Sequence, residues 1–372
     1  MKAFVRDPAR DKASSRRRYC RRGRGLHLYF RHVGPEMQRR FCELVDVSRL
    51  PRVFLHGNPH VDNYAKTERG AAMVDFDRAR YGPYAYDIVR FLVSAGISAR
   101  EQSRCLMPPT ARSSLRRGYA QGVLCPQLRY EEMHALRRRR AKRWQQSTVQ
   151  YVEANRLWAR KMRENAMPLE QLPLEQLLAS YARSREEPSL LEHYRVSEAA
   201  QIPGSMGKMH TVLLLESLDS SIDEHARALL LDFKEVYDEP DTRWFHNPFA
   251  HNGERMVRAG ELHAPGWEMR PGWATVGNTE LWVRQISPQQ VKVKRALEEA
   301  EQMDLCFAVG SQLGAAHAAS ATCAAGEPID REALAEHFLA NYEEYFYVAA
   351  QLEAELRRAY EMYTDRALRM RA

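Results

Sequence analysis

The chain has 372 residues, of which 44% are hydrophobic and 28% are charged. This composition is that of a globular protein, and the length suits two domains or one large bilobal domain. No run of about 18 apolar residues occurs and no apolar core of signal-peptide length lies near the start, so we expect neither a membrane span nor a secretory signal. The six cysteines contain no CxxC pair, which argues against a zinc site and a disulfide framework. We therefore expect reduced thiols and a cytoplasmic location.

The net charge of +8 is concentrated in two basic runs, at residues 16–24 and 136–143. The second run lies in a helical pattern with few aromatic residues nearby, which is typical of a solvated helix face. A basic helical protein that binds RNA or DNA remains an alternative, and it predicts a steep salt dependence of nucleic-acid affinity. We consider nucleic acid an unlikely partner, because a phosphate-bearing ligand fits the same charge balance. Residues 1–24 are expected to form a solvated basic arm.

In chain order, residues 26–46 predict a short strand or turn followed by a helix. The stretches RVFLHG (52–57) and AAMVDFD (71–77) predict two short strands on either side of a loop, because β-forming residues cluster there between glycine and charged residues. Residues 86–96 have apolar residues at helical spacing. From about 99 to 194 the pattern is almost wholly helical and predicts a helical layer.

The character changes after residue 195. The runs MHTVLLLES (209–217) and ALLLDFKEV (228–236) predict strands, a helix is expected at about 252–263, and WATVGNTELWVRQISP (273–288) predicts a further hairpin. Residues 289–320 predict a long helix, followed by one or two more. We expect a small antiparallel sheet region at 196–288, set against a helical region made of 25–195 and 289–372.

The stretch HGNPHVDN (56–63) followed by VDFD (74–77) has the layout of a phosphoryl-transfer site. Such a site needs a held metal, held phosphates and an oriented hydroxyl. Position 58 is where the general base belongs, and Asn63 and Asp75 follow with the amide and carboxylate oxygens that Mg²⁺ binds. The alternative is that HGNP is an ordinary turn and VDFD an edge strand with solvated acidic residues.

Downstream, the sequence offers parts of a nucleotide-phosphate site. IPGSMGK (202–208) places Gly204, Ser205 and Gly207 in a predicted hairpin turn, where backbone N–H groups can approach phosphates. Lys234 lies in the following predicted strand and would contact the α- and β-phosphates. On the helix after it, Glu254 or Glu261 would pair with Lys234. Taken alone, Lys234 would more often be an edge-strand lysine that reaches water.

The motifs HGNPHVDN and VDFD resemble HGDxHxxN and IDFD of the aminoglycoside phosphotransferase and protein-kinase-like superfamily. Their order ahead of the glycine hairpin, with IPGSMGKMHTVLLLE, LLLDFKEV and LGAAHAAS, resembles the bacterial family DUF2252 over about residues 26–345. That family's motifs read GDxHxxNF and NDFDExxxGPxxWDLxRL. The resemblance implies an α+β, bilobal kinase-like fold with permuted element order, in which ATP and Mg²⁺ serve transfer to an unidentified small-molecule or protein acceptor.

The resemblance also places His317, of LGAAHA, near His56 in space, although as a residue on its own it would more often be a core or capping histidine. Asp77 is expected to pair with Arg78 or Arg80, and Asp87 with Arg90 as a structural pair bracing the loop.

Asn58 stands where both families have aspartate. Asn cannot accept a proton from a hydroxyl, and general-base help contributes about 10²- to 10⁴-fold to such reactions. His56 belongs to the same loop, and His60 is a stand-in for the base only if it faces the phosphate. Asp62 is a weaker stand-in, because on an extended loop its side chain points away from that of Asn63. Two alternatives stay open: a slow kinase-like phosphotransferase, and a nucleotide-binding pseudokinase that acts as a regulatory or scaffold module.

Overall fold

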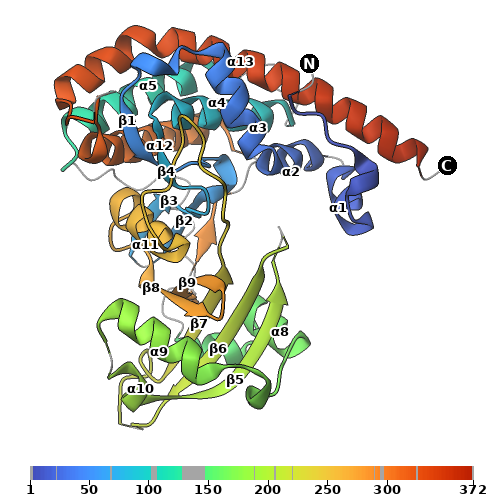
Figure 1. Cartoon of the computed structure of the whole chain (residues 1–372), viewed down its shortest axis with the longest axis vertical. Helices are drawn as coiled ribbons and strands as arrows, with labels where there is room; N and C mark the ends of the chain where they lie inside the picture. Colours follow the sequence, from blue (N-terminus) through green and yellow to red (C-terminus); the bar gives the residue numbers. More distant parts are fainter. Residues whose placement is uncertain are drawn as a thin grey trace.

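The computed structural model describes residues 3–21, 23–67, 69–101, 107–127, 147–187, 189–204, 207–219, 221–288, 290–293, 297–323 and 326–370. The fold is a mixture of helices and antiparallel sheets. A helical part lies at one end of the molecule and a five-stranded sheet at the other (Figure 1). Within the described ranges, none of the helices combines the length and the apolarity of a bilayer span.

The five-stranded sheet is antiparallel and has the order β5-β6-β7-β9-β8. Side chains alternate along its central strand β7, so that Leu229, Leu231 and Phe233 belong to one apolar cluster and Leu230 to another. Both faces of the sheet are therefore buried. The strands are β5 (Tyr194–Pro203), β6 (Met209–Ser217), β7 (Ala228–Glu235), β8 (Met269–Val276) and β9 (Thr279–Gln285).

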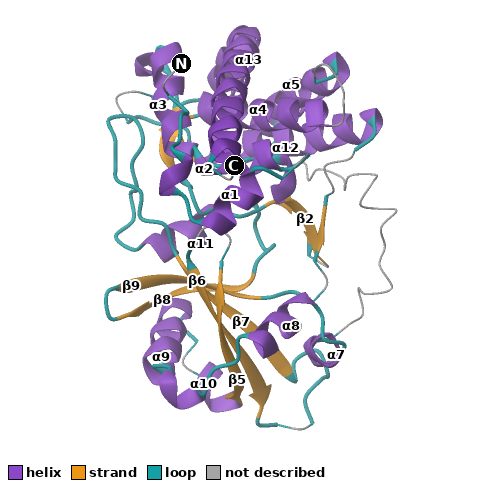
Figure 2. Cartoon of the chain, turned by 90° about the vertical axis from the view of Figure 1, so that its right-hand side faces the viewer, coloured by secondary structure: helices purple, strands orange, loops and turns teal. Residues whose placement is uncertain are grey.

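Short helices cover the two faces of this sheet (Figure 2). On one side lie α9 (Leu174–Arg185) and α10 (Leu190–His193), where Leu177 and Tyr181 pack on the strands. On the other side lie α7 (Thr148–Glu153) and α8 (Leu157–Glu164). The described residues between 147 and 193 are mostly helical, as predicted. Their assignment to the helical part was wrong, because their apolar side chains pack on the sheet.

The helical part contains two long helices near the C-terminus, α12 (Glu299–Ser320) and α13 (Arg331–Arg369). Around them lie α2 (Gly25–His32), α3 (Gly34–Leu44), α4 (Ala85–Glu101) and α5 (Pro109–Leu124). One large cluster of buried side chains joins these helices. The region predicted as a strand or turn before α3 is itself a helix, α2.

Two small sheets connect the helical part to the five-stranded sheet. β1 (Arg52–Leu55) pairs with β4 (Arg80–Pro83), and β3 (Gly70–Met73) pairs with β2 (Tyr64–Thr67), which also pairs with the short β10 (Val291–Lys292). The two predicted strands around the loop therefore exist but belong to different sheets. The loop of residues 56–63 runs between these sheets.

α11 (Asn252–His263) lies where the sequence predicted a helix, between the helical part and the five-stranded sheet (Figure 1). Its buried residues contact both sides: Ala259 packs against Phe76, and Met256 packs against Trp282 of β9. α11 thus ties the two parts of the chain together.

The N-terminal segment is packed against α13 and is not a solvated arm. Phe4 and Tyr19 are buried, and the Tyr29 hydroxyl donates to the carbonyl of Phe4. The Tyr363 hydroxyl of α13 donates to Asp11, 2.7 Å away. The prediction failed because the segment is rich in arginine and has few apolar residues, and the sequence did not show that these few are buried.

α5 and α12 pack unusually closely through glycine. A Cβ atom added at Gly122 would lie 2.1 Å from the carbonyl oxygen of Ser311, and one added at Gly314 would lie 2.3 Å from that of Tyr119. Contacts this short are repulsive, so the two backbones approach each other only because no side chain stands between them. This contact sets the position of Tyr119 and of the His317 end of α12.

We predict that Gly122→Ala forces the two helices apart and destabilises the protein by about 3 kcal/mol, the upper part of the range for overpacked cores. The matched control is Gly260→Ala in α11, where the added Cβ lies 3.6 Å from the ring of Phe76 and has room. That control should be neutral or more stable by up to about 1 kcal/mol, because alanine favours helix. Urea unfolding measures both, and equal effects would contradict the close packing.

Candidate functional site

The loop of residues 56–63 is held by one buried carboxylate. Asp87, in the first turn of α4, accepts hydrogen bonds from the backbone N–H groups of His56 (2.7 Å) and Gly57 (3.0 Å). Gly57 has φ +77°, and a Cβ there would meet the carbonyl oxygen of Arg78 at 1.8 Å, so only glycine fits. The turn at HGN therefore has a backbone shape set by Asp87 and by glycine.

His317 supports Asp87 from α12. Its Nε2 lies 3.3 Å from the Asp87 carboxylate, and its Nδ1 lies 2.9 Å from the Tyr119 hydroxyl. Burial opposes ionisation of Asp87, but the hydrogen bond from His317 lowers its pKa. His317 contacts the loop through Asp87, and the structure gives it a positioning role.

Asn58 is locked by a buried arginine. Its side-chain oxygen accepts from Arg90 Nε (3.0 Å) and Arg90 Nη2 (2.6 Å). Asn58 is only 6% exposed, while Arg90 is fully buried with its guanidinium 4.1 Å from the ring centre of Phe30. The predicted pair between Asp87 and Arg90 is wrong: each braces the loop separately, Asp87 through backbone N–H groups and Arg90 through Asn58.

Lys234 meets two carboxylates. Its Nζ lies 2.6 Å from Asp77 Oδ2 and 3.4 Å from Asp75 Oδ1. Asp75 has φ +75°, an unusual backbone for a residue other than glycine, and its side chain is 26% exposed. Arg31 of α2 approaches the other oxygen of Asp75 at 3.8 Å. Segments separated by nearly 160 positions thus converge on one small charged cluster, which we call the Asp75 cluster.

The charges of the Asp75 cluster interact strongly. Burial would raise the pKa of Asp75, but Lys234, Arg31 and Lys292 lower it. For Asp77 the pKa is raised, because burial and the neighbouring Asp75 outweigh Lys234. The pKa of Lys234 is raised by the two carboxylates in spite of burial. With Arg31 and Lys292 counted beside Lys234, three positive groups surround the two carboxylates, which suits a phosphate group bound next to them.

Asp77 therefore has a different place from the one predicted. We expected it to pair with Arg78 or Arg80, but those arginines pair with Glu239, and Arg80 also pairs with Asp241. The side chain of Asp77 is free to reach Lys234. The sequence missed Arg31 and Lys292 as members of the site, since neither lies in a motif that points to phosphate chemistry.

The predicted partner of Lys234 on α11 was wrong as well. Glu254 and Glu261 both pair with Arg258 on the outer face of the helix. The inward-facing residue is Arg255, whose guanidinium donates to the backbone carbonyls of Asp77 (3.0 Å) and Ala79 (2.6 Å). The helix was predicted correctly, but its inward face lies one residue later.

The remaining predicted site residues belong to the loop of residues 56–63 and to the β5–β6 hairpin. Asn63 is buried, donates from Nδ2 to the carbonyl of Asn58 (3.4 Å), and accepts from the N–H of Val74 (2.9 Å) at its backbone oxygen. Gly204 and Gly207 form the β5–β6 hairpin turn, where Gly207 has φ +84° and donates to the carbonyl of Gly204. Ser205 lies outside the described residues.

His56 and His60 are interior side chains and face no open site. Both are fully buried; the ring of His56 packs against Phe76 and His263, and that of His60 against His27. Burial lowers the pKa of each, so both are neutral near pH 7. His60 cannot stand in as the general base from this position. Asp62 lies 3.4 Å from His27 Nδ1.

Two stretches of the chain match known protein families. Residues 125–366, more than half of the chain, match the family described as an uncharacterized protein conserved in bacteria, DUF2252. The chain belongs to the DUF2252 family. Residues 4–121 match the phosphotransferase enzyme family. No curated protein and no solved structure matches the chain.

The two family matches meet at the Asp75 cluster. Asp75 and Asp77 lie in the stretch that matches the phosphotransferase enzyme family, and Lys234 lies in the stretch that matches DUF2252. The HGNPHVDN and VDFD motifs of this DUF2252 protein thus fall within the phosphotransferase match, and the DUF2252 match begins later than the resemblance suggested. At the level of families, the N-terminal part is phosphotransferase-like.

We predict that Asn58→Asp stabilises this DUF2252 protein at pH 7 by about 1 kcal/mol, because a carboxylate makes a stronger hydrogen bond than an amide to the buried Arg90. Arg90 should lower the pKa of the new Asp below its unfolded value of about 3.9, so the gain is present above that pH and is lost as the pH falls through the folded pKa. Thermal unfolding at pH 7 and at pH 3 measures it.

The control is Asn58→Leu, which keeps the volume but leaves the buried guanidinium without this acceptor. It should cost about 1 to 3 kcal/mol. An Asp variant less stable than the parent at pH 7 would show that Arg90 does not need a counter-charge.

A second prediction concerns the buried histidines His56, His60 and His263, whose pKa values are all lowered by burial, for His263 to about 3. Their folded pKa values lie below the unfolded value of about 6.5. Their contribution to stability is therefore complete above pH 6.5 and is lost as the pH falls; for His263, whose folded pKa is about 3, the loss at pH 5 is about 2 kcal/mol. Urea unfolding between pH 7.5 and 5 should show this loss.

The variant His60→Phe should reduce the loss of stability between pH 7.5 and 5, because it removes one of the imidazoles that is buried as a neutral group. The matched control is His193→Gln, because His193 is exposed and its removal should leave the pH profile unchanged. A profile that stays flat from pH 7.5 to 5 in the parent protein would contradict the burial of these imidazoles as neutral groups.

Proposed function

We propose that this protein is a kinase-like phosphotransferase fold that binds ATP with Mg²⁺ at the Asp75 cluster. The observation that carries the proposal is the contact of Lys234 with Asp75 and Asp77, 3.4 and 2.6 Å away, across nearly 160 residues of chain. A strand lysine that reaches the metal-binding carboxylates is what phosphoryl transfer requires, since catalysis there rests on positioning and charge. The phosphotransferase match of residues 4–121 supports it.

The donors present fit Mg²⁺. Mg²⁺ takes one or two carboxylates together with phosphate oxygens and water. Asp75 is partly exposed and Asp77 adjoins it, and among the described residues no hydrogen bond uses the side-chain oxygen of Asn63. Asp75 and Asn63 would hold the ion with Asp77 beside them. When bound, Mg²⁺ neutralises charge on the transferred phosphoryl group.

The cations around the cluster would hold the phosphates. Lys234 lies between the two carboxylates, Arg31 approaches from α2, and Lys292 contributes positive potential from β10. The β5–β6 hairpin turn at Gly204 and Gly207 would cover the phosphates with backbone N–H groups. In the sequence, the proposed metal ligands come before the glycine turn and Lys234. This order is the basis for proposing a permuted kinase-like arrangement.

In this proposal the small lobe consists of the five-stranded sheet with α7 to α11, about residues 147–288, and the large lobe of residues 25–127 and 289–372. The lower boundary is earlier than residue 196 because helices 147–193 pack on the sheet. Lys234 comes from the small lobe, while Asp75 and Asn58 come from the large lobe. The acceptor is a small molecule or a protein.

A second candidate function is nucleotide binding without transfer, as a regulatory or scaffold module. The observation that favours it is the bond between Asn58 and Arg90. At the position of the general base, the chain has an amide whose oxygen already accepts two hydrogen bonds from a buried guanidinium. Transfer by this protein would proceed without general-base help, and thus about 10²- to 10⁴-fold more slowly than with it.

We predict that ATP raises the melting temperature only when Mg²⁺ is present, since a ligand that binds the folded state stabilises it. Lys234→Met and Asp75→Asn should each abolish this shift, because one removes the phosphate cation and the other the exposed metal ligand. The matched control is Lys161→Met on α8, a surface lysine over Trp158, which should keep the full shift. The proposal fails if ATP gives no shift with the parent protein, or if Lys234→Met leaves it intact.

The contribution of Asp77 is tested separately. Asp77→Asn keeps Asp75 as a metal ligand but releases Lys234 from its shortest contact, 2.6 Å. Nucleotide stabilisation should persist with this variant, reduced by less than for Asp75→Asn. If the two variants lose the shift equally, both carboxylates bind the ion.

Asn58→Asp distinguishes the two candidate functions. If the rest of the machinery is competent, ATP consumption should rise by about 10²-fold or more while nucleotide affinity stays nearly constant, because the base acts on the acceptor. Unchanged turnover with intact nucleotide binding favours the regulatory module. Loss of nucleotide binding would show that Asn58 itself contacts metal or phosphate.

A further inference from the structure

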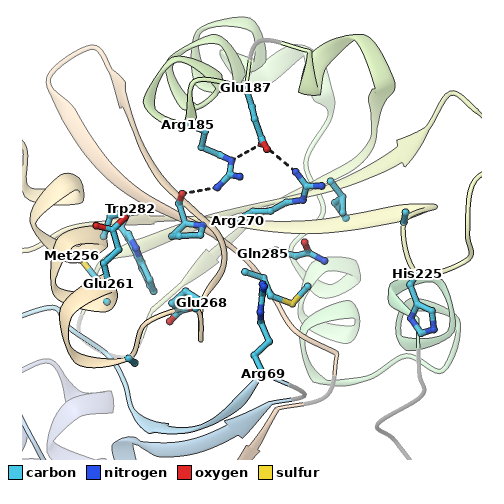
Figure 3. Close-up of a pocket in the computed structure, with 18 of the residues that line it drawn as sticks. Arg69, Arg185, Glu187, His225, Met256, Glu261, Glu268, Arg270, Trp282 and Gln285 are labelled. Carbon is cyan, nitrogen blue, oxygen red and sulfur yellow. Dashed lines mark hydrogen bonds and ion pairs between the residues drawn. The ribbon is translucent and has the colours of Figure 1, made fainter. Parts of the chain in front are cut away.

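We propose a second ligand site, separate from the Asp75 cluster, that binds a flat nitrogen heterocycle bearing an amino group and one anionic substituent. It is a cavity of about 690 Å³ between α11, the starts of β7 and β8 and the end of β9 (Figure 3). Neither Asp75, Asp77 nor Lys234 lines it. This inference goes beyond the proposed function and does not depend on it.

The first argument is an unused buried amide. Gln285, the last residue of β9, is only 5% exposed and lines the cavity. Among the described residues, no hydrogen bond uses its carboxamide, and Figure 3 shows this group among the side chains that line the cavity. The carboxamide is thus reached from the cavity and has no protein partner among the described residues. Gln285 therefore offers one donor and one acceptor, side by side, to a ligand edge.

The second argument is the remaining wall. Trp282 supplies a flat aromatic surface, and Met256 and Val257 of α11 supply apolar contacts; all three are at least 94% buried. Glu268, buried at the start of β8, provides carboxylate oxygens that accept from Arg284 and retain capacity for another N–H donor. The interior thus suits a flat ring whose edge carries both N–H groups and an acceptor nitrogen.

The third argument is the charge at the mouth. Arg69, in the turn between β2 and β3, is exposed at the cavity rim, and no ion pair of its guanidinium occurs among the described residues. Arg185 and Arg270 on the opposite side share Glu187, which leaves that group of three with one net positive charge. An anion at the outer end of the ligand would lie between these arginines, while the ring lies inside against Trp282.

This chemistry occurs in nucleoside monophosphates and in pterin carboxylates. Both have an amino-substituted nitrogen ring at one end and an anion at the other. The carboxamide of Gln285 would form hydrogen bonds with the ring edge. Glu268 would accept a hydrogen bond from the amino group, and Arg69 would contact the anion. Metal-free conditions are the proper test, because they separate binding at this cavity from the Mg²⁺-dependent binding proposed at the Asp75 cluster.

The test is equilibrium dialysis of the full chain in EDTA with adenosine monophosphate, guanosine monophosphate and pterin-6-carboxylate as probes. We expect one binding equivalent per chain for at least one probe. Gln285→Met, nearly equal in volume, should weaken binding at least about tenfold, the effect of losing about 1.4 kcal/mol of hydrogen bonding. Arg69→Gln should weaken the anionic probe and leave the matching neutral compound, adenosine or pterin, unchanged.

Asp75→Asn is the control for the other site and should leave binding in EDTA intact. Loss of EDTA-resistant binding in Asp75→Asn, or no binding of any probe to the parent chain, would overturn the proposal. So would ribose 5-phosphate binding as tightly as adenosine monophosphate, because the ring would then have no part in recognition. Failure here leaves the Mg²⁺-dependent shift by ATP untouched, so the two proposals fail separately.

Discussion

The loop that carries the HGNPHVDN motif depends on the buried carboxylate of Asp87. A buried charge is tolerated only when hydrogen-bond donors surround it. Here the donors are the N–H groups of His56 and Gly57 and the imidazole of His317. Since α4 supplies the carboxylate, β1 leads into the loop, and α12 supplies the histidine, one ionised group joins three elements. The close contact of α5 with α12 through glycine in turn sets where Tyr119 and His317 lie.

Within this loop, the exchange of a carboxylate for an amide at position 58 alters charge more than shape. Asn58 Oδ1 occupies the acceptor position for Arg90, as a carboxylate oxygen would. Arg90 is then fully buried with only neutral acceptors bonded to it, and burial lowers its pKa. An amide at position 58 thus gives Arg90 its acceptor without adding a charge to the loop. Whatever this protein does now, its fold does not require the charge that a general base would supply.

The sequence predicted those parts of the site that depend on residue type and spacing. Two separated motifs placed the strand lysine Lys234 and Asp75 in one site, where the structure brings them within 3.4 Å of each other. The glycine hairpin turn and the helix at 252–263 were also predicted from the sequence. It did not predict orientations. The periodicity of α11 cannot show which of two adjacent residues, Glu254 or Arg255, faces inward. Nor can helical periodicity show whether residues 147–193 pack on helices or on a sheet, because both partners require the same apolar stripe. The partner predicted for Asp77 was wrong, because its neighbours Arg78 and Arg80 pair instead with Glu239, which lies about 160 positions away in the sequence.

Residues of α11 both hold the segment of Asp77 and line the cavity, because adjacent residues of a helix point in different directions. Arg255 donates to the carbonyl oxygens of Asp77 and Ala79, and Met256 and Val257, the next residues along, line the cavity beside β9. Successive residues of a helix point about 100° apart, so the residues of one turn can contact both the segment of Asp77 and the cavity beside β9. In the segment of Asp77, Arg255 donates to backbone carbonyls, so these contacts do not depend on the protonation of the carboxylates. One turn of α11 therefore lines the cavity and also holds the segment of Asp77 and Ala79, through two hydrogen bonds of 3.0 and 2.6 Å.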